Sequence, residues 1–242
     1  ANMVRCLAAA VFFSPLLLSR LSDIVALPLM AVFVAVLSGV VGHGIGDTMY
    51  IISIKLVGVS KAVPLASTYP LFTFLMTVLL FSEAWTPICL LGTVTMVLGI
   101  ALITHEGRSE DLVRRADSNF YLGIATSIVT SFVWALNFVL VKIVVAFVGF
   151  VDLVGLRIVS VAGVLLVLSP LIDRHLTFLR LKAKTWLLMG LAGLIAMGLA
   201  WVLLAFSLAH VDMSKAAPLS SISPLLATVI GATFLKEKVG LR

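Results

Sequence analysis

Charged residues are scarce in this chain. Only 17 Lys and Arg and 11 Asp and Glu occur among 242 residues, or 12% of the sequence, whereas 62% of the residues are hydrophobic. A water-soluble domain is typically about a quarter charged and about half apolar. The composition therefore excludes an ordinary soluble fold. The net charge of +6 is typical of loops beside an anionic membrane surface and does not indicate nucleic-acid binding.

The sequence also lacks the motifs of common enzyme classes. Its two cysteines, Cys6 and Cys89, lie in apolar runs without metal-ligand spacing, and two cysteines make no disulfide framework. There is no glycine-rich phosphate loop, no HExxH motif and no GxSxG motif. We therefore expect no cofactor, no metal site and no use of ATP.

Long apolar segments are what the chain has in abundance. Stretches of about 18 or more apolar residues predict membrane-spanning helices, and the alternating pattern of barrel strands is absent. Turn residues or charges separate the segments. The sequence predicts an all-α polytopic membrane protein with eight spans, at residues 3–19, 27–54, 62–82, 86–104, 120–146, 150–172, 184–208 and 214–235.

One stretch of sequence occurs twice, 154 positions apart. Residues 60–71 read SKAVPLASTYPL, residues 214–225 read SKAAPLSSISPL, and eight of the twelve positions are identical. At the same spacing, Glu83 corresponds to Glu237. Such a duplication within apolar sequence is typical of transporters built from two related halves, which bind their substrate between the halves.

The longest polar stretch separates the two halves, so we expect a first repeat at 1–105, a linker at 106–119 and a second repeat at 120–242. Span 3–19 aligns with residues 157–171 of the second half, and Arg5 falls on Arg157. Spans 120–146 and 86–104 have no counterparts. Each complete half should therefore have five helices, with the first and last helices of the protein missing from this chain. An odd number of helices per half predicts two inverted five-helix repeats.

The repeated pattern SKAxPLxSxxPL, followed by a glutamate, resembles the drug/metabolite transporter superfamily, specifically its EamA-domain permeases. So do Trp134, Asn137 and Lys142 in the span that opens the second half, and the spacing of Gly92 and Gly99. The resemblance implies ten helices in two inverted repeats, a central cavity, and export or exchange of small metabolites. It names no substrate. The related small multidrug exporters couple transport to protons through a glutamate in their first helix. The span at 120–146 contains no acidic residue, so this role cannot be carried over to it.

His43 and Asp47 form an unusual polar pair, because both lie inside the apolar span at 27–54. Their i, i+4 spacing puts them on one helix face within reach of a hydrogen bond. An ionisable residue at membrane depth costs about 2.5–3.5 kcal/mol on insertion scales and indicates a functional site by default. Because imidazole titrates near neutral pH, the pair is a candidate for substrate binding or for coupling to protons. The alternatives are a self-satisfied structural pair, or Asp47 at an aqueous mouth.

Prolines recur in the duplicated sequence. A proline inside a helix removes a backbone donor and clashes with the preceding turn, so these helices should be kinked or locally unwound. The hydroxyl residues between the prolines can satisfy the freed backbone or line a path. The alternative is that the prolines only shape helix packing. The four residues are Pro64, Pro70, Pro218 and Pro224.

Aromatic, amide and hydroxyl side chains complete the set of candidates. Small-molecule sites are mostly apolar with a few polar anchors, whereas Trp and Tyr also form belts at membrane surfaces. The candidate residues for substrate binding or proton coupling are His43, Asp47, Tyr50, Ser67, Tyr69, Trp134, Asn137, Trp201 and Ser221.

The sequence thus favours a secondary transporter in the plasma membrane, an exporter or exchanger of small organic solutes that alternates access between its repeats. Its partners would be the solute, membrane lipids, and protons or another coupling ion, with no nucleic acid. Two alternatives stay open: a scaffold or sensor without transport, and an intramembrane enzyme with His43 and Asp47 as an acid–base pair. The positive-inside rule places the 105–119 joint in the cytoplasm, whereas the usual arrangement of the family places it outside. The orientation of the chain in the membrane therefore stays open too.

Overall fold

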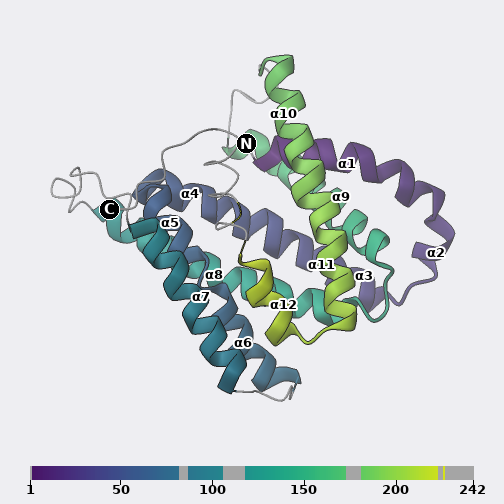
Figure 1. The fold of residues 1–242 in the computed structure, drawn as a ribbon. Coiled ribbons are helices and arrows are strands. Elements are labelled where there is room, and N and C mark those ends of the chain that lie inside the picture. Colours follow the sequence, from purple (N-terminus) through teal and green to yellow (C-terminus); the bar gives the residue numbers. More distant parts are fainter. Residues whose placement is uncertain (1, 82–86, 106–117, 173–180, 223–225, 227–242) are drawn as a thin grey trace. The chain divides into compact units, whose positions relative to one another are not determined.

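The structure is a computed structural model, and it describes residues 2–81, 87–105, 118–172, 181–222 and 226. Every regular element in these ranges is helical (Figure 1). The elements are α1 (Asn2–Ser19), α2 (Leu21–Val25), α3 (Leu29–Gly39), the π helix η1 (Val40–Gly46), α4 (Asp47–Val57), α5 (Val59–Ala66), α6 (Tyr69–Phe81), α7 (Pro87–His105), α8 (Ser118–Val144), α9 (Phe150–Ile172), α10 (Ala183–Gly193), the π helix η4 (Leu194–Leu199), α11 (Ala200–His210) and α12 (Met213–Ser220).

Six helical segments within the described ranges are long and apolar enough to cross a membrane, which confirms six of the eight predicted spans. The fourth predicted span, 86–104, forms the helix α7. Most of the eighth, 214–235, lies outside the described residues, which include its beginning as part of α12. The six segments are Asn2–Ser19, Leu29–Val57, Lys61–Phe81, Asn119–Val144, Phe150–Leu168 and Ala183–His210.

Two of these spans contain a π-helical segment in their middle. The η1 segment joins α3 to α4, and η4 joins α10 to α11. At the end of each segment the hydrogen bond reaches back five residues, from the Asp47 amide to the Gly42 carbonyl and from the Ala200 amide to the Ile195 carbonyl. Such π segments are rare and occur frequently at functional sites. The sequence pattern did not predict them.

Local structure recurs at the spacing of the duplicated sequence. The helices α3 and α10 are both 11 residues long and begin at Leu29 and Ala183. The short helices α5 and α12 are both 8 residues long and begin at Val59 and Met213. These two pairs of corresponding segments therefore begin at equivalent positions and have equal lengths.

The prolines of the duplicated sequence accompany helix breaks, as predicted. A two-residue turn that begins at the buried Ser67 separates α5 from α6, between Pro64 and Pro70. The helix α12, which contains Pro218, ends two residues later and is also followed by a turn. Pro224 lies outside the described residues.

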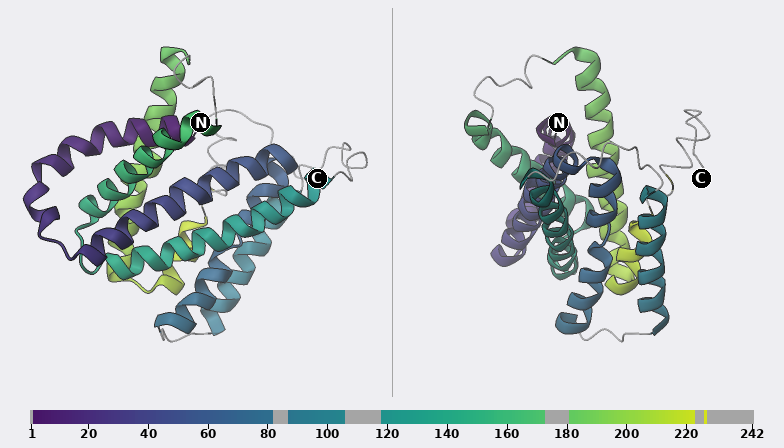
Figure 2. Two further views of the ribbon diagram at one scale, coloured as in Figure 1. Left: turned by 180° about the vertical axis from the view of Figure 1, so that it is seen from behind. Right: turned by 90° about the vertical axis from the view of Figure 1, so that its left-hand side faces the viewer.

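The chain folds as two compact units. The first contains residues 1–48 and 139–211, and the second contains residues 49–138 and 212–242. In the first unit α1 packs against α9 and α10, and α3 packs against α9; in the second, α6 packs against α12 and α5 against α7 (Figure 2). The unit boundaries fall inside the continuous helices α4 and α8. The predicted division into two sequence repeats stays a prediction.

Two glycines bring helices of the first unit into backbone contact. A Cβ atom added at Gly39 would lie 2.6 Å from the carbonyl oxygen of Arg157, and one added at Gly193 would clash in the same way with the carbonyl oxygen of Arg5. The sequence alignment pairs these two arginines, so the two contacts are equivalent. Each glycine stands immediately before a π segment.

Replacing Gly39 by alanine is expected to destabilise the protein by about 1–3 kcal/mol, because the new methyl group meets backbone that cannot move aside. The apparent melting temperature of the purified protein measures this effect. Gly163→Ala on α9 is the matched control, since nothing lies within 4 Å of the added Cβ and alanine favours a helix. Equal melting temperatures for the two variants would contradict the close approach of α3 and α9.

Candidate functional site

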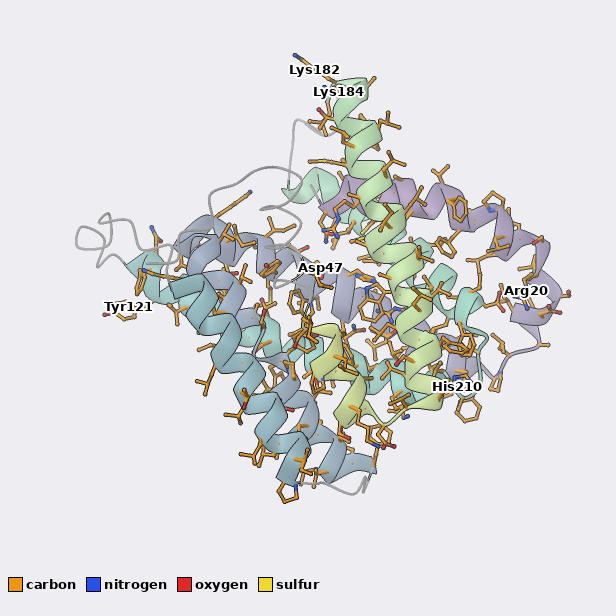
Figure 3. All side chains as sticks on the ribbon, in the orientation of Figure 1. Arg20, Asp47, Tyr121, Lys182, Lys184 and His210 are labelled. Carbon is orange, nitrogen blue, oxygen red and sulfur yellow. The ribbon has the colours of Figure 1, made fainter. Side chains whose placement is uncertain are left out.

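The predicted His43–Asp47 pair lies in the first unit, where η1 passes into α4 (Figure 3 labels Asp47). The Nδ1 atom of His43 is 3.3 Å from Oδ2 of Asp47, which confirms the predicted contact. The His43 side chain is 3% exposed and that of Asp47 is 18% exposed. Because Nδ1 faces a carboxylate, Nδ1–H donates to Asp47, and Nε2 of the neutral ring keeps its lone pair. This Nε2 atom is buried and forms no hydrogen bond with the described residues.

A side chain of α1 completes the hydrogen bonding of the π segment. The Asn2 amide donates to the backbone carbonyl of His43 at 2.7 Å and to the Thr48 hydroxyl at 3.3 Å. In an α-helix the His43 carbonyl would accept from the Asp47 amide, which here reaches back to Gly42. Asn2 therefore replaces the backbone donor that the His43 carbonyl loses in the π geometry. Sequence reasoning missed Asn2, because a polar residue at the end of an apolar span is usually interfacial.

Two more side chains surround His43, from α9 and α11. The Trp201 indole meets the imidazole edge-on, with ring centroids 5.0 Å apart. The Arg157 guanidinium lies over the same indole, with its Cζ atom 3.9 Å from the ring centroid. Trp201 was a predicted candidate, and at the 154-residue spacing it corresponds to Asp47. Arg157, which is fully buried, was missed as a site residue, although a lone arginine inside an apolar span is a signal of the same kind as Asp47.

We call these five residues (Asn2, His43, Asp47, Arg157 and Trp201) the His43 cluster. Asp47 acts electrostatically on both His43 and Arg157, and Arg5 acts on His43. Charges interact strongly in an apolar surrounding, and an uncompensated charge there is costly. Counted together with the neighbouring Arg5, two arginines and one aspartate leave one excess positive charge while the imidazole is neutral. The cluster is therefore chemically suited to exchange a proton at Nε2 and to attract an anion.

The remaining aromatic candidates gather in the second unit. Trp134 packs against Tyr50 and Tyr69, with ring centroids 5.1 Å and 5.9 Å apart, and Tyr69 contacts Phe138 at 5.5 Å. Asn137, one turn after Trp134 on α8, is buried. We call Tyr50, Tyr69, Trp134 and Phe138 the aromatic cluster. The burial of Tyr69 and Phe138 favours a core or pocket over a belt at the membrane surface.

Hydroxyl groups connect the aromatic cluster to the broken helix α12. The Tyr69 hydroxyl is 2.7 Å from the Ser220 hydroxyl and donates to the Ala217 carbonyl at 3.3 Å. The Ser221 hydroxyl donates to the carbonyl of Pro218 at 2.9 Å. The hydroxyl thus adds a second hydrogen bond to a carbonyl of the last turn of α12, which also accepts the Ser221 amide.

The sequence matches the EamA-like transporter family over residues 1–105 and 121–242. The chain belongs to this family. An uncharacterized transporter of Archaeoglobus fulgidus is 27% identical over 252 residues, which span 100% of this chain and 81% of the relative. A protein of known crystal structure has the same fold, with a TM-score of 0.77 at 16% identity, over 96% of this chain and 76% of that protein.

Membership of the EamA-like family confirms the resemblance that the repeated sequence motif indicated. The protein is a multi-pass integral membrane transporter, and a small-molecule substrate follows from the family. A family of transporters also disfavours the scaffold and enzyme alternatives. The comparisons name no substrate for this chain.

In this EamA-like transporter the predicted candidates fall into two groups. Within each unit the structure brings several of them into contact. His43, Asp47 and Trp201 lie in the first unit, and Tyr50, Ser67, Tyr69, Trp134, Asn137 and Ser221 lie in the second.

Lys142, one of the residues on which the resemblance rests, has a structural role. Its Nζ atom donates to the carbonyl oxygens of Leu208 at 2.7 Å and Val211 at 3.1 Å, at the carboxyl end of α11. Carbonyls at this end of a helix have no intrahelical donors and carry partial negative charge, so a cation there stabilises the helix by about 0.3–1 kcal/mol.

Tyr69→Phe is expected to destabilise the EamA-like transporter by about 0.5–1.5 kcal/mol, because it removes a buried hydroxyl that bonds α6 to α12. The apparent melting temperature in detergent measures the effect. Tyr121→Phe is the control, since Tyr121 is 69% exposed (Figure 3). If both variants melted at the same temperature, the Tyr69 hydroxyl would have no part in holding α12.

Proposed function

We propose that this EamA-like transporter is a secondary transporter that exports or exchanges small organic solutes, such as amino acids or other metabolites, across the cell membrane. The observation that carries the proposal is the buried His43–Asp47 contact inside a π segment of a membrane-spanning helix. Ionisable groups inside membrane spans are costly, and they mark substrate pathways and proton relays.

In this proposal the His43–Asp47 pair carries the coupling proton. Asp47 holds the imidazole in the tautomer with hydrogen on Nδ1, so a proton arriving at the pair binds Nε2. The imidazolium that forms is stabilised by the Asp47 carboxylate. Release of the proton restores the neutral ring without any large rearrangement. A proton gradient or solute exchange then drives transport.

We further propose that the two halves are inverted five-helix repeats, between which access to the substrate alternates. Support comes from three observations: the matching helix boundaries 154 residues apart, the equivalent contacts of Gly39 and Gly193, and the family match on either side of a linker. Inverted repeats are the usual basis of alternating access in secondary transporters.

The aromatic cluster and Asn137 are proposed to contact the organic part of the solute. Aromatic faces supply apolar contact area, and a buried amide supplies directional hydrogen bonds, which together are typical of small-molecule sites. Ser67 and Ser221 stand beside the helix breaks, where hydroxyl groups can serve both the backbone and a solute.

Asp47→Asn is expected to lower proton-driven solute flux by about tenfold or more, because asparagine cannot stabilise an imidazolium as a carboxylate does. The experiment reconstitutes the full-length gene product in proteoliposomes and measures uptake of radiolabelled amino acids and other metabolites, with and without a pH gradient.

Asp23→Asn is the matched control for this experiment, because it makes the same chemical change at a side chain that is 67% exposed. Flux that responds to the gradient equally in Asp47→Asn and wild type would remove the pair from coupling. Absence of flux for every solute tested would contradict the transport proposal itself.

A further inference from the structure

We propose that Arg157 and the Nε2 atom of His43 form an anion subsite, which binds the carboxylate of an organic acid with Trp201 as its wall. This inference rests on the proposed transport function and specifies its substrate class. It adds to Nε2, which carries the coupling proton, two groups of the His43 cluster that the coupling role does not use, namely the buried guanidinium and the indole.

The first step concerns the atom that His43 offers to a ligand. Its Nδ1 is committed to Asp47, so a ligand can bind the ring only at Nε2. This atom is buried in a side chain that is 3% exposed, and it has no hydrogen-bond partner among the described residues. A buried polar atom is normally satisfied, so the missing partner of Nε2 indicates a group that binds there during the transport cycle.

The second step concerns the indole that both groups share. Trp201 contacts the His43 ring at 5.0 Å between centroids, and the Arg157 guanidinium lies 3.9 Å above the indole. A guanidinium stacked on an aromatic face keeps its N–H groups directed outward in its own plane, in a fork that matches a carboxylate. The indole thus contacts both the imidazole and the guanidinium, and the two groups are close enough to interact electrostatically.

The third step is the charge of the surroundings. Among the described residues that act on His43, α1 contributes Arg5, α9 contributes Arg157, α4 contributes Asp47, and α11 contributes the uncharged Trp201. One positive charge is in excess when His43 is neutral. An ammonium group would add to this excess, whereas a carboxylate reduces it.

The charge balance also links the anion to the proton. When Nε2 takes up a proton from solvent, the new N–H becomes a donor that can bind the carboxylate directly. The proton and the anion together add no net charge to the cluster. At a pH where the free acid and the unliganded His43 are both deprotonated, binding of the organic acid should therefore be accompanied by uptake of about one proton.

The test compares three probes with one skeleton and different head groups: phenylacetate, phenylacetamide and phenethylamine. Binding to the purified full-length protein in lipid nanodiscs is measured by titration calorimetry in buffers of different ionisation enthalpy, which also reports proton uptake. Phenylacetate is expected to bind about tenfold or more tightly than the amide, with proton uptake, and the amine more weakly than either. Equal affinity for the acid and the amide would overturn the proposal.

Variants then assign the preference to Arg157. Arg157→Gln should abolish the preference for the acid over the amide, and Arg157→Lys should keep part of it, because lysine retains the charge without the fork. Lys55→Gln is the control, since it removes one positive charge from an exposed side chain outside the cluster. An undiminished preference in Arg157→Gln would overturn the proposal. If Arg157→Gln fails to fold, the Arg157→Lys variant provides the test. Unchanged affinity of Arg157→Lys for phenylacetate would then overturn the proposal.

The two proposals fail separately. If neutral or cationic solutes are transported in proteoliposomes while phenylacetate does not bind, the anion subsite is wrong and the transport function stands. If phenylacetate binds with the expected dependence on Arg157 but no solute moves, the subsite stands and the transport function fails.

Discussion

A positive charge buried inside a membrane-spanning helix has to be compensated, and the local structure of the first unit follows from this requirement. Arg157 is fully buried, its guanidinium lies on Trp201, and Asp47 provides the opposite charge. The backbone of α9 reaches α3, in the same membrane span as Asp47, because Gly39 has no side chain. The same arrangement leaves His43 buried beside a carboxylate, with one ring nitrogen available, which is a useful property for a transporter.

The second unit is organised around helix breaks rather than charge. Prolines interrupt its helices, and hydroxyl groups near the breaks satisfy carbonyl oxygens that a continuous helix would have bonded. Tyr69, the first residue after one break, bonds to Ser220 at the end of α12 and packs against Trp134. Irregular backbone inside a membrane protein is tolerated where side chains or a water-filled path satisfy it. The two units thus offer different chemistry, one charged and one aromatic.

The sequence predicted the features that depend on local pattern: the apolar spans, the contact of His43 with Asp47, and the interrupted helices at the prolines. It did not predict the π segments, because their hydrogen bonds depend on tertiary contacts such as that of Asn2 with the His43 carbonyl. Arg157 was recognised in the repeat but not as a site residue, since its significance comes from Trp201, which lies 44 positions away in sequence. Glu83 and Glu237, which correspond in the repeated sequence, lie outside the described residues.

The most direct test of this account is a double-mutant cycle on the unfolding free energy, with Asp47→Asn, Arg157→Gln and both changes together, measured by denaturant titration in mixed micelles. If the two charges compensate each other, each single variant leaves the other charge buried without its partner, and the double variant removes both charges together. The double variant should then be more stable than the sum of the single effects predicts, by about 1–3 kcal/mol. Additive effects would show that Asp47 does not balance Arg157, and would contradict the account.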